Sequence, residues 1–298
     1  MTTGPNGERA DALPRSAPGH AARASIEGGL CVERRGDGAR TLVLLHGWAM
    51  NLRVFDALAQ ALAPHFTVLA IDLPGHGRSA EAPSLAHDGW TLERLAAAIA
   101  PALPRDSLLL GWSLGGQVAL QLALDAPERV AALALVATTP RFVVGADWPH
   151  GIAASVLAHF ARHLGGDYRD TVRDFLDLQV RGSRDAPAAL ATLQSALFSH
   201  GEAAPAVLAR ALEVLSRADL RARLGAIAVP ALVLSGQHDR VTPPGAARAL
   251  AAGLARGQHH EFARCGHAPF LSHEAGFAAL LRGFAAGVPG AAHAAVTP

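Results

Sequence analysis

One serine stands where a nucleophile could be held. The stretch "LLLGWSLGGQVALQ" (108–121) runs from an apolar segment through Gly111, Ser113 and Gly115 and then continues at helical spacing. This G-x-S-x-G pattern predicts an elbow between a strand and a helix, in which the serine backbone is strained and the glycines avoid Cβ clashes. Helix N-terminal N–H groups beside the hydroxyl favour developing negative charge. We therefore predict Ser113 as a nucleophile, with an ordinary tight turn as the alternative.

A serine hydroxyl needs a base to take its proton, and the base needs an orienting acid. With a nucleophile elbow of this kind the three follow in the chain order Ser, acid, His. Asp239 comes just after the apolar run 232–234, and His267 lies in a loop between an expected last strand and the final helix. We predict Asp239 as the acid and His267 as the base. A turn aspartate and an incidental histidine are the alternatives.

Other aspartates and histidines are less well placed in the expected elements. Asp72 follows an earlier strand, and Asp125 ends the helix that leaves the elbow. His259 and His260 fall inside the last strand, and His273 begins the final helix. None of these positions suits the acid or the base.

An oxyanion hole needs two N–H donors near the nucleophile. Leu114, the residue after the serine, supplies the first donor. The loop "LLHGWAMN" (44–51) follows an early strand, and its His46–Gly47 turn would aim the Trp48 N–H at the same point. We expect His46 to be structural and the Trp48 indole to wall the pocket, with a plain core tryptophan as the alternative.

These residues must be positioned by a parallel sheet, because short apolar runs alternate with amphipathic stretches. Strands are expected at 41–47, 66–72, 107–111, 130–138, 229–236 and at the start of 257–277, and helices at 54–63, 91–100 and 114–127. Between 140 and 225 only helices are expected, near 152–164, 167–181, 186–197 and 205–216. Since this insertion follows a strand's carboxyl end, where open α/β sheets bind ligands, it predicts a lid.

The expected organisation is one α/β domain with that lid. The core comprises 28–139 and 226–287, the lid 140–225, a disordered N-terminal extension 1–27 and a flexible tail 288–298. At 298 residues and 50% hydrophobic content, the chain can bury one large core. No apolar run approaches the roughly 18 residues of a membrane span, and no secretory signal is visible. We expect a protein with no membrane contact.

The net charge and the cysteine content argue against several classes of protein. The net charge of +1 gives no reason to expect nucleic-acid binding. The two cysteines, Cys31 and Cys265, are too few for a disulfide framework and stand in no metal-ligand spacing. We expect a cytoplasmic monomer with no metal and no organic cofactor.

A family resemblance rests on motifs spread over nearly the whole expected folded body. They are "LLHGW", "DLPGHGRS" (72–79), "GWSLGGQVA" (111–119), "PERV" (127–130), "DWP" (147–149), "FLDLQ" (175–179) and "GHAPFLSH" (266–273). Together they resemble the pimeloyl-acyl-carrier-protein methyl ester esterase family of biotin synthesis, which has the α/β-hydrolase fold. The more specific signals are the tryptophan before the nucleophile, the tryptophan after the first His-Gly, and "FLDLQ".

This resemblance implies roles for particular residues. It makes Ser113, Asp239 and His267 a catalytic triad, and it makes Trp48 and Leu114 an oxyanion hole. It also implies that the acyl channel is lined by Phe175, Leu176, Asp177, Leu178 and Gln179. An amphipathic turn packed against the core is the alternative for that last segment.

Family members cleave a methyl ester on a pimeloyl chain carried by acyl carrier protein, and they hold this acidic partner with lid arginines. The arginines implied here are Arg169, Arg173, Arg181 and Arg184. However, residues 138–225 contain ten arginines against nine acidic residues, and acidic neighbours of Arg169 and Arg173 could pair with them. A general carboxylesterase acting on small free esters therefore remains the alternative. A non-catalytic binding protein would normally lack a triad member, and a haloalkane-dehalogenase-type enzyme needs Asp in place of Ser113.

Overall fold

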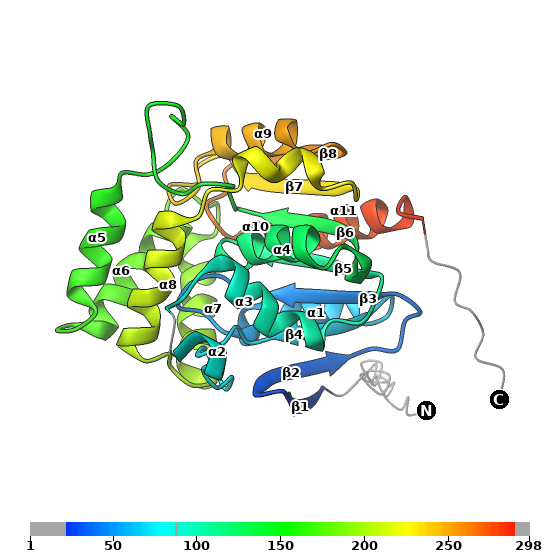
Figure 1. Ribbon diagram of the computed structural model, residues 1–298, viewed down its shortest axis with the longest axis horizontal. Helices are drawn as coiled ribbons and strands as arrows, with labels where there is room; N and C mark the ends of the chain where they lie inside the picture. Colours follow the sequence, from blue (N-terminus) through cyan, green and yellow to red (C-terminus); the bar gives the residue numbers. More distant parts are fainter. Residues whose placement is uncertain (1–21, 87–88, 290–298) are drawn as a thin grey trace, which may run out of the picture.

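An eight-stranded sheet organises the computed structural model, which describes residues 22–86 and 89–289 (Figure 1). The strand order is β1-β2-β4-β3-β5-β6-β7-β8, and all strands from β4 to β8 in this order are parallel. The strands are β1 (Arg23–Glu27), β2 (Leu30–Arg35), β3 (Thr41–Leu45), β4 (Thr67–Ile71), β5 (Ser107–Trp112), β6 (Val130–Val136), β7 (Ala231–Gly236) and β8 (Gly257–Phe262). The predicted α/β fold with a mostly parallel sheet is confirmed, and every predicted strand is present.

Helices cover both faces of this sheet. They are α1 (Asp56–Leu62), α2 (Pro83–Ala86), α3 (Leu92–Ile99), α4 (Leu114–Asp125), α9 (Pro244–Gly253), α10 (Pro269–Ser272) and α11 (Glu274–Ala286), with 3₁₀ turns η1 (Leu52–Phe55), η2 (Ala100–Ala102), η3 (Pro127–Arg129) and η4 (Arg221–Ala226). In Figure 1, α3 and α4 lie in front of the sheet, and α1 and α11 lie behind it. No helix within the described ranges is long and apolar enough to cross a membrane.

A helical insertion follows β6. It consists of α5 (Ala154–His163), α6 (Tyr168–Val180), α7 (Ala186–Ser199) and α8 (Pro205–Arg217). Figure 1 shows these helices gathered at the left, beyond the carboxyl ends of the parallel strands. All four were predicted. Their position is the one where an open α/β sheet receives its ligand.

The ordered chain extends beyond both predicted limits of the core. Residues 23–27, assigned above to a disordered extension, form β1 and pair with β2 through a tight turn at Gly28 and Gly29, both with positive φ. The prediction missed β1 because its five residues are all exposed and directly follow a stretch rich in Gly, Pro and charged residues, with no long apolar run to mark a strand. At the other end Val288, assigned to the tail, is buried. The predicted extension over 1–21 and the tail over 290–298 lie outside the described residues.

Candidate active site

The elbow at Ser113 has the backbone strain that its sequence predicts. Ser113 joins β5 to α4 with φ 56° and ψ −117°, a conformation that costs a non-glycine residue about 1–3 kcal/mol. Its N–H donates to Val136 O at 3.0 Å, and its carbonyl accepts from Thr138 Oγ1 at 2.7 Å. These bonds hold the strained residue from both sides and fix the position of its side chain.

Two glycines make the elbow possible. A Cβ on Gly111 would overlap the carbonyl oxygen of Gly115, and a Cβ on Gly115 would overlap the carbonyl oxygen of Leu45. Because these neighbours are backbone atoms, they cannot move aside as a flexible side chain could. The glycines therefore let β5, α4 and the end of β3 meet at the serine.

Asp239 and His267 form a buried pair across the loops that follow β7 and β8. His267 Nδ1 lies 2.8 Å from Asp239 Oδ2, and both residues are almost inaccessible to solvent. A neutral imidazole that donates from Nδ1 to a carboxylate keeps its Nε2 lone pair free to accept a proton. His267 Nε2 is buried and has no hydrogen-bond partner among the described residues.

Thr242 also fixes the Asp239 carboxylate, and sequence reasoning missed it. Its hydroxyl donates to Oδ2 at 2.7 Å and its N–H donates to Oδ1 at 2.9 Å, while the Val241 N–H donates to Oδ1 at 2.8 Å. Together with His267, these donors occupy both carboxylate oxygens. The available signal was a threonine three residues after an aspartate, the spacing of a side-chain-closed turn.

Trp112 connects Ser113 to the histidine loop, the loop after β8 that carries His267. It directly precedes Ser113, its indole N–H donates to His267 O at 2.8 Å, and its ring centroid lies 5.6 Å from that of His267. Trp112 therefore helps to fix the position of the His267 imidazole relative to the elbow. No hydrogen bond joins Ser113 Oγ to His267 Nε2 in this state, which is common for catalytic pairs without substrate.

The predicted oxyanion residues border the same point. A Cβ placed on Gly47 would lie 3.2 Å from Ser113 Cβ, so the loop before Trp48 passes directly beside Ser113. Leu114 begins α4, where N–H groups lack partners within the helix. The Trp48 indole is buried, donates to Leu208 O of α8 at 2.9 Å, and meets the Phe175 ring edge-on at 4.8 Å. It therefore contacts the helical insertion as well as the core.

The segment "FLDLQ" lies on α6 and divides by exposure. Phe175, Leu176 and Gln179 are buried, whereas the Asp177 side chain is exposed and Leu178 is partly buried. Both amide atoms of the Gln179 side chain are buried without a hydrogen-bond partner among the described residues. The backbone carbonyl oxygen of Gln179 accepts the backbone N–H of His267 at 2.7 Å. The structure thus brings α6 to the histidine loop, but it turns Asp177 away.

Phe160 of α5 joins this aromatic group, although the sequence did not single it out. Its ring centroid lies 5.4 Å from that of Phe175 and 6.4 Å from that of Trp48. The pair with Phe175 packs edge to face, an arrangement that stabilises beyond simple burial, and the pair with Trp48 is tilted. The three rings form an apolar wall shared by the insertion and the oxyanion loop.

The four arginines implied for carrier binding have different surroundings. Arg169 pairs with Glu202 at 2.7 Å, and Arg173 pairs with Asp170 at 2.9 Å. Arg184 has only a 3.6 Å contact with its neighbour Asp185, and Arg181 makes no ion pair within the described part of the chain. Arg181 and Arg184 are therefore the more available pair.

The residues rejected above as acid or base do lie where their elements were expected. Asp125 ends α4 and pairs with Arg223, His259 and His260 lie within β8, and His273 caps α11. Asp72 follows β4 and meets His200 at 3.0 Å. Because β3 separates β4 from β5, this second pair is not beside the elbow.

Two further histidines are buried behind the oxyanion loop. His46 Nε2 accepts from the Leu73 N–H at 2.9 Å, and Nδ1 lies 2.8 Å from Gly47 O, which agrees with the predicted structural role. Burial lowers the pKa of His46 well below its usual value and lowers the pKa of His76 to about 4. Both imidazoles are therefore neutral in the folded protein at neutral pH.

We expect these histidines to make the fold sensitive to acid. A pKa that is lower in the folded state gives stability that is complete above about pH 6.5 and is lost as pH falls toward 4. His76 alone should cost about 2 kcal/mol between pH 6.5 and 5. Asp72, whose pKa burial raises to about 6, opposes part of this loss. Thermal unfolding followed from pH 7.5 to 5 should show a falling midpoint.

A substitution pair separates His76 from the other groups. His76→Gln should flatten the pH dependence of the unfolding midpoint, while the exposed His260→Gln should leave it unchanged. An unaltered slope in His76→Gln would show that this histidine does not govern acid sensitivity.

Comparisons with known proteins agree with this geometry. The model of the alpha/beta hydrolase fold family matches residues 40–274. A pimeloyl-[acyl-carrier protein] methyl ester esterase from Nitrosomonas europaea is 44% identical over 241 residues, which cover 81% of this chain and 93% of that protein. The enzyme of the same name from Xanthomonas oryzae is 42% identical, covering 83% of this chain and 96% of its own. The chain belongs to this esterase family.

Solved structures give the same fold. An esterase from Rhodococcus sp. ECU1013 matches with a TM-score of 0.70 at 26% identity, covering 90% of this chain and 99% of its own. An esterase from Exiguobacterium antarcticum matches with a TM-score of 0.76 at 23% identity, covering 86% and 94%. The second likeness concerns the fold alone.

Proposed function

We propose that this protein is a serine carboxylesterase that hydrolyses the methyl ester of pimeloyl-acyl-carrier protein and releases methanol, in the supply of a biotin precursor. The observation that carries this proposal is the buried Asp239–His267 pair beside the strained Ser113, in a chain of this esterase family. Ser113, His267 and Asp239 act as nucleophile, base and orienting acid.

The reaction begins with acylation. Ser113 Oγ attacks the ester carbonyl carbon while His267 Nε2 takes the serine proton. The Trp48 and Leu114 N–H groups stabilise the oxyanion that forms on the carbonyl oxygen. The bond to the methoxy oxygen then breaks, and His267 returns the proton so that methanol leaves.

Deacylation reverses these roles with water as the nucleophile. His267 takes a proton from water as the water oxygen attacks the acyl-enzyme carbonyl carbon. The bond to Ser113 Oγ then breaks, and His267 gives the proton to Ser113 Oγ, which frees the acid and restores the enzyme. Asp239 stabilises the imidazolium in both halves and holds Nδ1 as the donor. Each step uses only side chains of this chain, two backbone N–H groups and water.

The apolar wall of Trp48, Phe160 and Phe175 supports an acyl substrate. These rings carry no charge that could pair with an ionic group of a substrate. Their apolar surface suits a methylene chain. The direct test compares kcat/KM for pimeloyl-carrier-protein methyl ester with kcat/KM for short nitrophenyl esters. A higher value for the carrier substrate supports the proposal, and equal values favour a general carboxylesterase.

Carrier binding is best supported on Arg181 and Arg184. Both follow α6, and the Arg184 N–H donates to Arg264 O at 2.9 Å, which joins this segment to the histidine loop. Arg264 is itself exposed, so three exposed arginines lie on the two segments that this hydrogen bond joins. Carrier proteins are acidic, and charge complementarity of this kind guides their approach.

Salt provides the first test of that surface. We expect kcat/KM on the carrier substrate to fall steeply as ionic strength rises, because exposed charges are screened over about 8 Å at physiological salt. A neutral short ester should be nearly unaffected. Initial-rate assays of both substrates over the same series of salt concentrations measure the difference in the salt dependence of kcat/KM.

Charge reversal gives a matched comparison. Arg181→Glu with Arg184→Glu should raise KM for the carrier substrate by about tenfold, with little change for small esters. Arg105 is exposed and lies before the amino end of β5, opposite the carboxyl ends of the parallel strands. Arg105→Glu should change KM neither for the carrier substrate nor for small esters. Equal salt sensitivity for both substrates, with no effect of the double reversal, would falsify carrier docking on this surface.

A further inference from the structure

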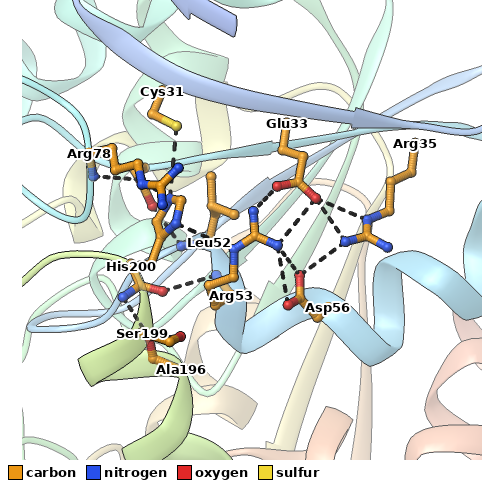
Figure 2. A network of polar contacts seen from close by, with 12 residues as sticks. Cys31, Glu33, Arg35, Leu52, Arg53, Asp56, Arg78, Ala196, Ser199 and His200 are labelled. Atoms are coloured by element: carbon orange, nitrogen blue, oxygen red, sulfur yellow. Dashed lines mark hydrogen bonds and ion pairs between the residues drawn. The ribbon is translucent and has the colours of Figure 1, made fainter. Parts of the chain in front are cut away.

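A second polar cluster lies where the helical insertion meets the core (Figure 2). Its centre consists of Cys31 on β2, Asp72 just after β4 and His200 just after α7, all three buried. The thiol sulfur, a carboxylate oxygen and an imidazole nitrogen lie within 4.8 Å of one another. None of these residues takes part in the proposed ester hydrolysis.

The spacing of these three atoms matches a small metal site. His200 Nε2 lies 3.0 Å from Asp72 Oδ2 and 3.9 Å from Cys31 Sγ. A tetrahedral Zn²⁺ ion, with bonds of about 2.0 Å to nitrogen or oxygen and about 2.3 Å to sulfur, sets these separations near 3.3 and 3.5 Å. These two separations therefore need adjustments of less than about half an ångström, and the third, from Cys31 Sγ to the Asp72 carboxylate, lies within 4.8 Å and has to close to about 3.5 Å.

Backbone donors hold the Asp72 carboxylate in place. Asp72 Oδ1 accepts the Leu52 N–H at 2.7 Å and Oδ2 accepts the Arg78 N–H at 2.9 Å. Such bonds orient a carboxylate as the outer contacts of known metal ligands do.

The surrounding charges permit an added cation. Arg53 and Arg78 face the cluster, but the Arg53 guanidinium is paired with Glu33 and also lies 3.1 Å from Asp56. Figure 2 shows these carboxylates between Arg53 and Arg35. The positive charge of Arg53 is therefore largely neutralised before an ion arrives.

A solvent-facing groove lies next to the cluster, although none of the three candidate ligands lines it. A groove of about 420 Å³ lies between η1 and α7, and its lining includes Arg53, Ala196 and Ser199. Arg53 and Ser199 are immediate neighbours of His200, the first through a 3.5 Å contact from Arg53 Nε to His200 Nδ1. An ion could enter here and keep a water molecule as its fourth ligand.

We propose that Cys31, Asp72 and His200 bind a thiophilic divalent cation, with Zn²⁺ as the best match, and that the ion fastens the helical insertion to the core. On binding, Cys31 loses its thiol proton and becomes a thiolate ligand. The imidazole proton moves from Nε2 to Nδ1, so the long contact in which Nδ1 accepts the Arg53 Nε–H is lost. One proton is released for each ion bound.

The test uses the wild-type protein after treatment with a chelator. Added Co²⁺ should bind once per chain and give the near-ultraviolet charge-transfer absorption of a cobalt–thiolate bond, which Zn²⁺ should then remove. Zn²⁺ at a hundredfold excess over its Kd should raise the thermal unfolding midpoint by about 5–10 °C. No substrate is involved, so the result does not depend on the proposed esterase activity.

Variants locate the ion. Cys31→Ser should abolish the thiolate absorption, whereas Cys265→Ser should retain it, because Cys265 is equally buried but lies against Ser272. His200→Gln should weaken Zn²⁺ binding by about tenfold or more. If wild type shows neither thiolate absorption nor stabilisation by Zn²⁺, the cluster is only a hydrogen-bonded contact and the proposal is wrong. Absorption that persists in Cys31→Ser also overturns it.

Discussion

Replacing Ser113 by Ala should remove nearly all esterase turnover, lowering kcat by about 10³-fold or more. The hydroxyl oxygen is the only protein atom in the proposed cycle that bonds covalently to the acyl group. The fold should remain intact, since the backbone of this residue is held by Val136 and Thr138 and its side chain contributes little packing. Measurement of kcat together with thermal unfolding separates the two effects.

The activity of Ser113→Ala tests the proposal that the protein is a serine esterase. Turnover that survives in a folded variant would exclude an acyl-enzyme at this position. Incubation of wild type with a slow ester, followed by mass measurement of the intact protein, should show an added acyl group that the variant lacks.

The second large effect is expected for Asp239→Asn, which should lower kcat by about 10³- to 10⁴-fold with little change in KM. The Val241 and Thr242 N–H groups both donate to Oδ1, so the amide oxygen of asparagine should occupy that position. Its NH₂ group then faces His267 Nδ1 and donates to it. The imidazole proton is thereby moved to Nε2, where the base needs a lone pair.

A matched substitution tests the assignment of the acid. Asp125→Asn alters an aspartate that ends α4 and pairs with Arg223, away from the histidine, and should leave kcat close to wild type. If Asp239→Asn instead retained near wild-type turnover, the orienting acid would have to be another residue. The steady-state kinetics of the two variants on one substrate provide the comparison.

Local sequence patterns carry much of the fold and the elbow. The alternation of apolar runs predicts every parallel strand, and Gly111, Ser113 and Gly115 predict a strained turn whose φ is indeed positive. These features depend on residues that are neighbours in the chain. The order of Asp239 and His267 after the serine likewise follows from the position of each after a strand.

Contacts between distant segments were beyond such patterns. Cys31, Asp72 and His200 are separated by 41 and 128 residues, so no spacing along the chain indicates that they meet. The hydrogen bond from the Trp48 indole to Leu208 also depends on how the insertion docks. Strand β1 was missed for a different reason, since its pairing uses backbone groups and its side chains are all exposed.

The insertion and the catalytic loops share bonds that limit how this family can change its substrates. Trp48 is joined to α8, the His267 N–H is joined to Gln179 of α6, and Asn51 Nδ2 donates to Ala196 O of α7 at 2.8 Å. A chimera that grafts another protein's insertion between β6 and β7 would therefore disturb the oxyanion and histidine loops together. The region is not an exchangeable module, and new specificity is more accessible through single side chains on α5 and α6 than through transplantation of the whole segment.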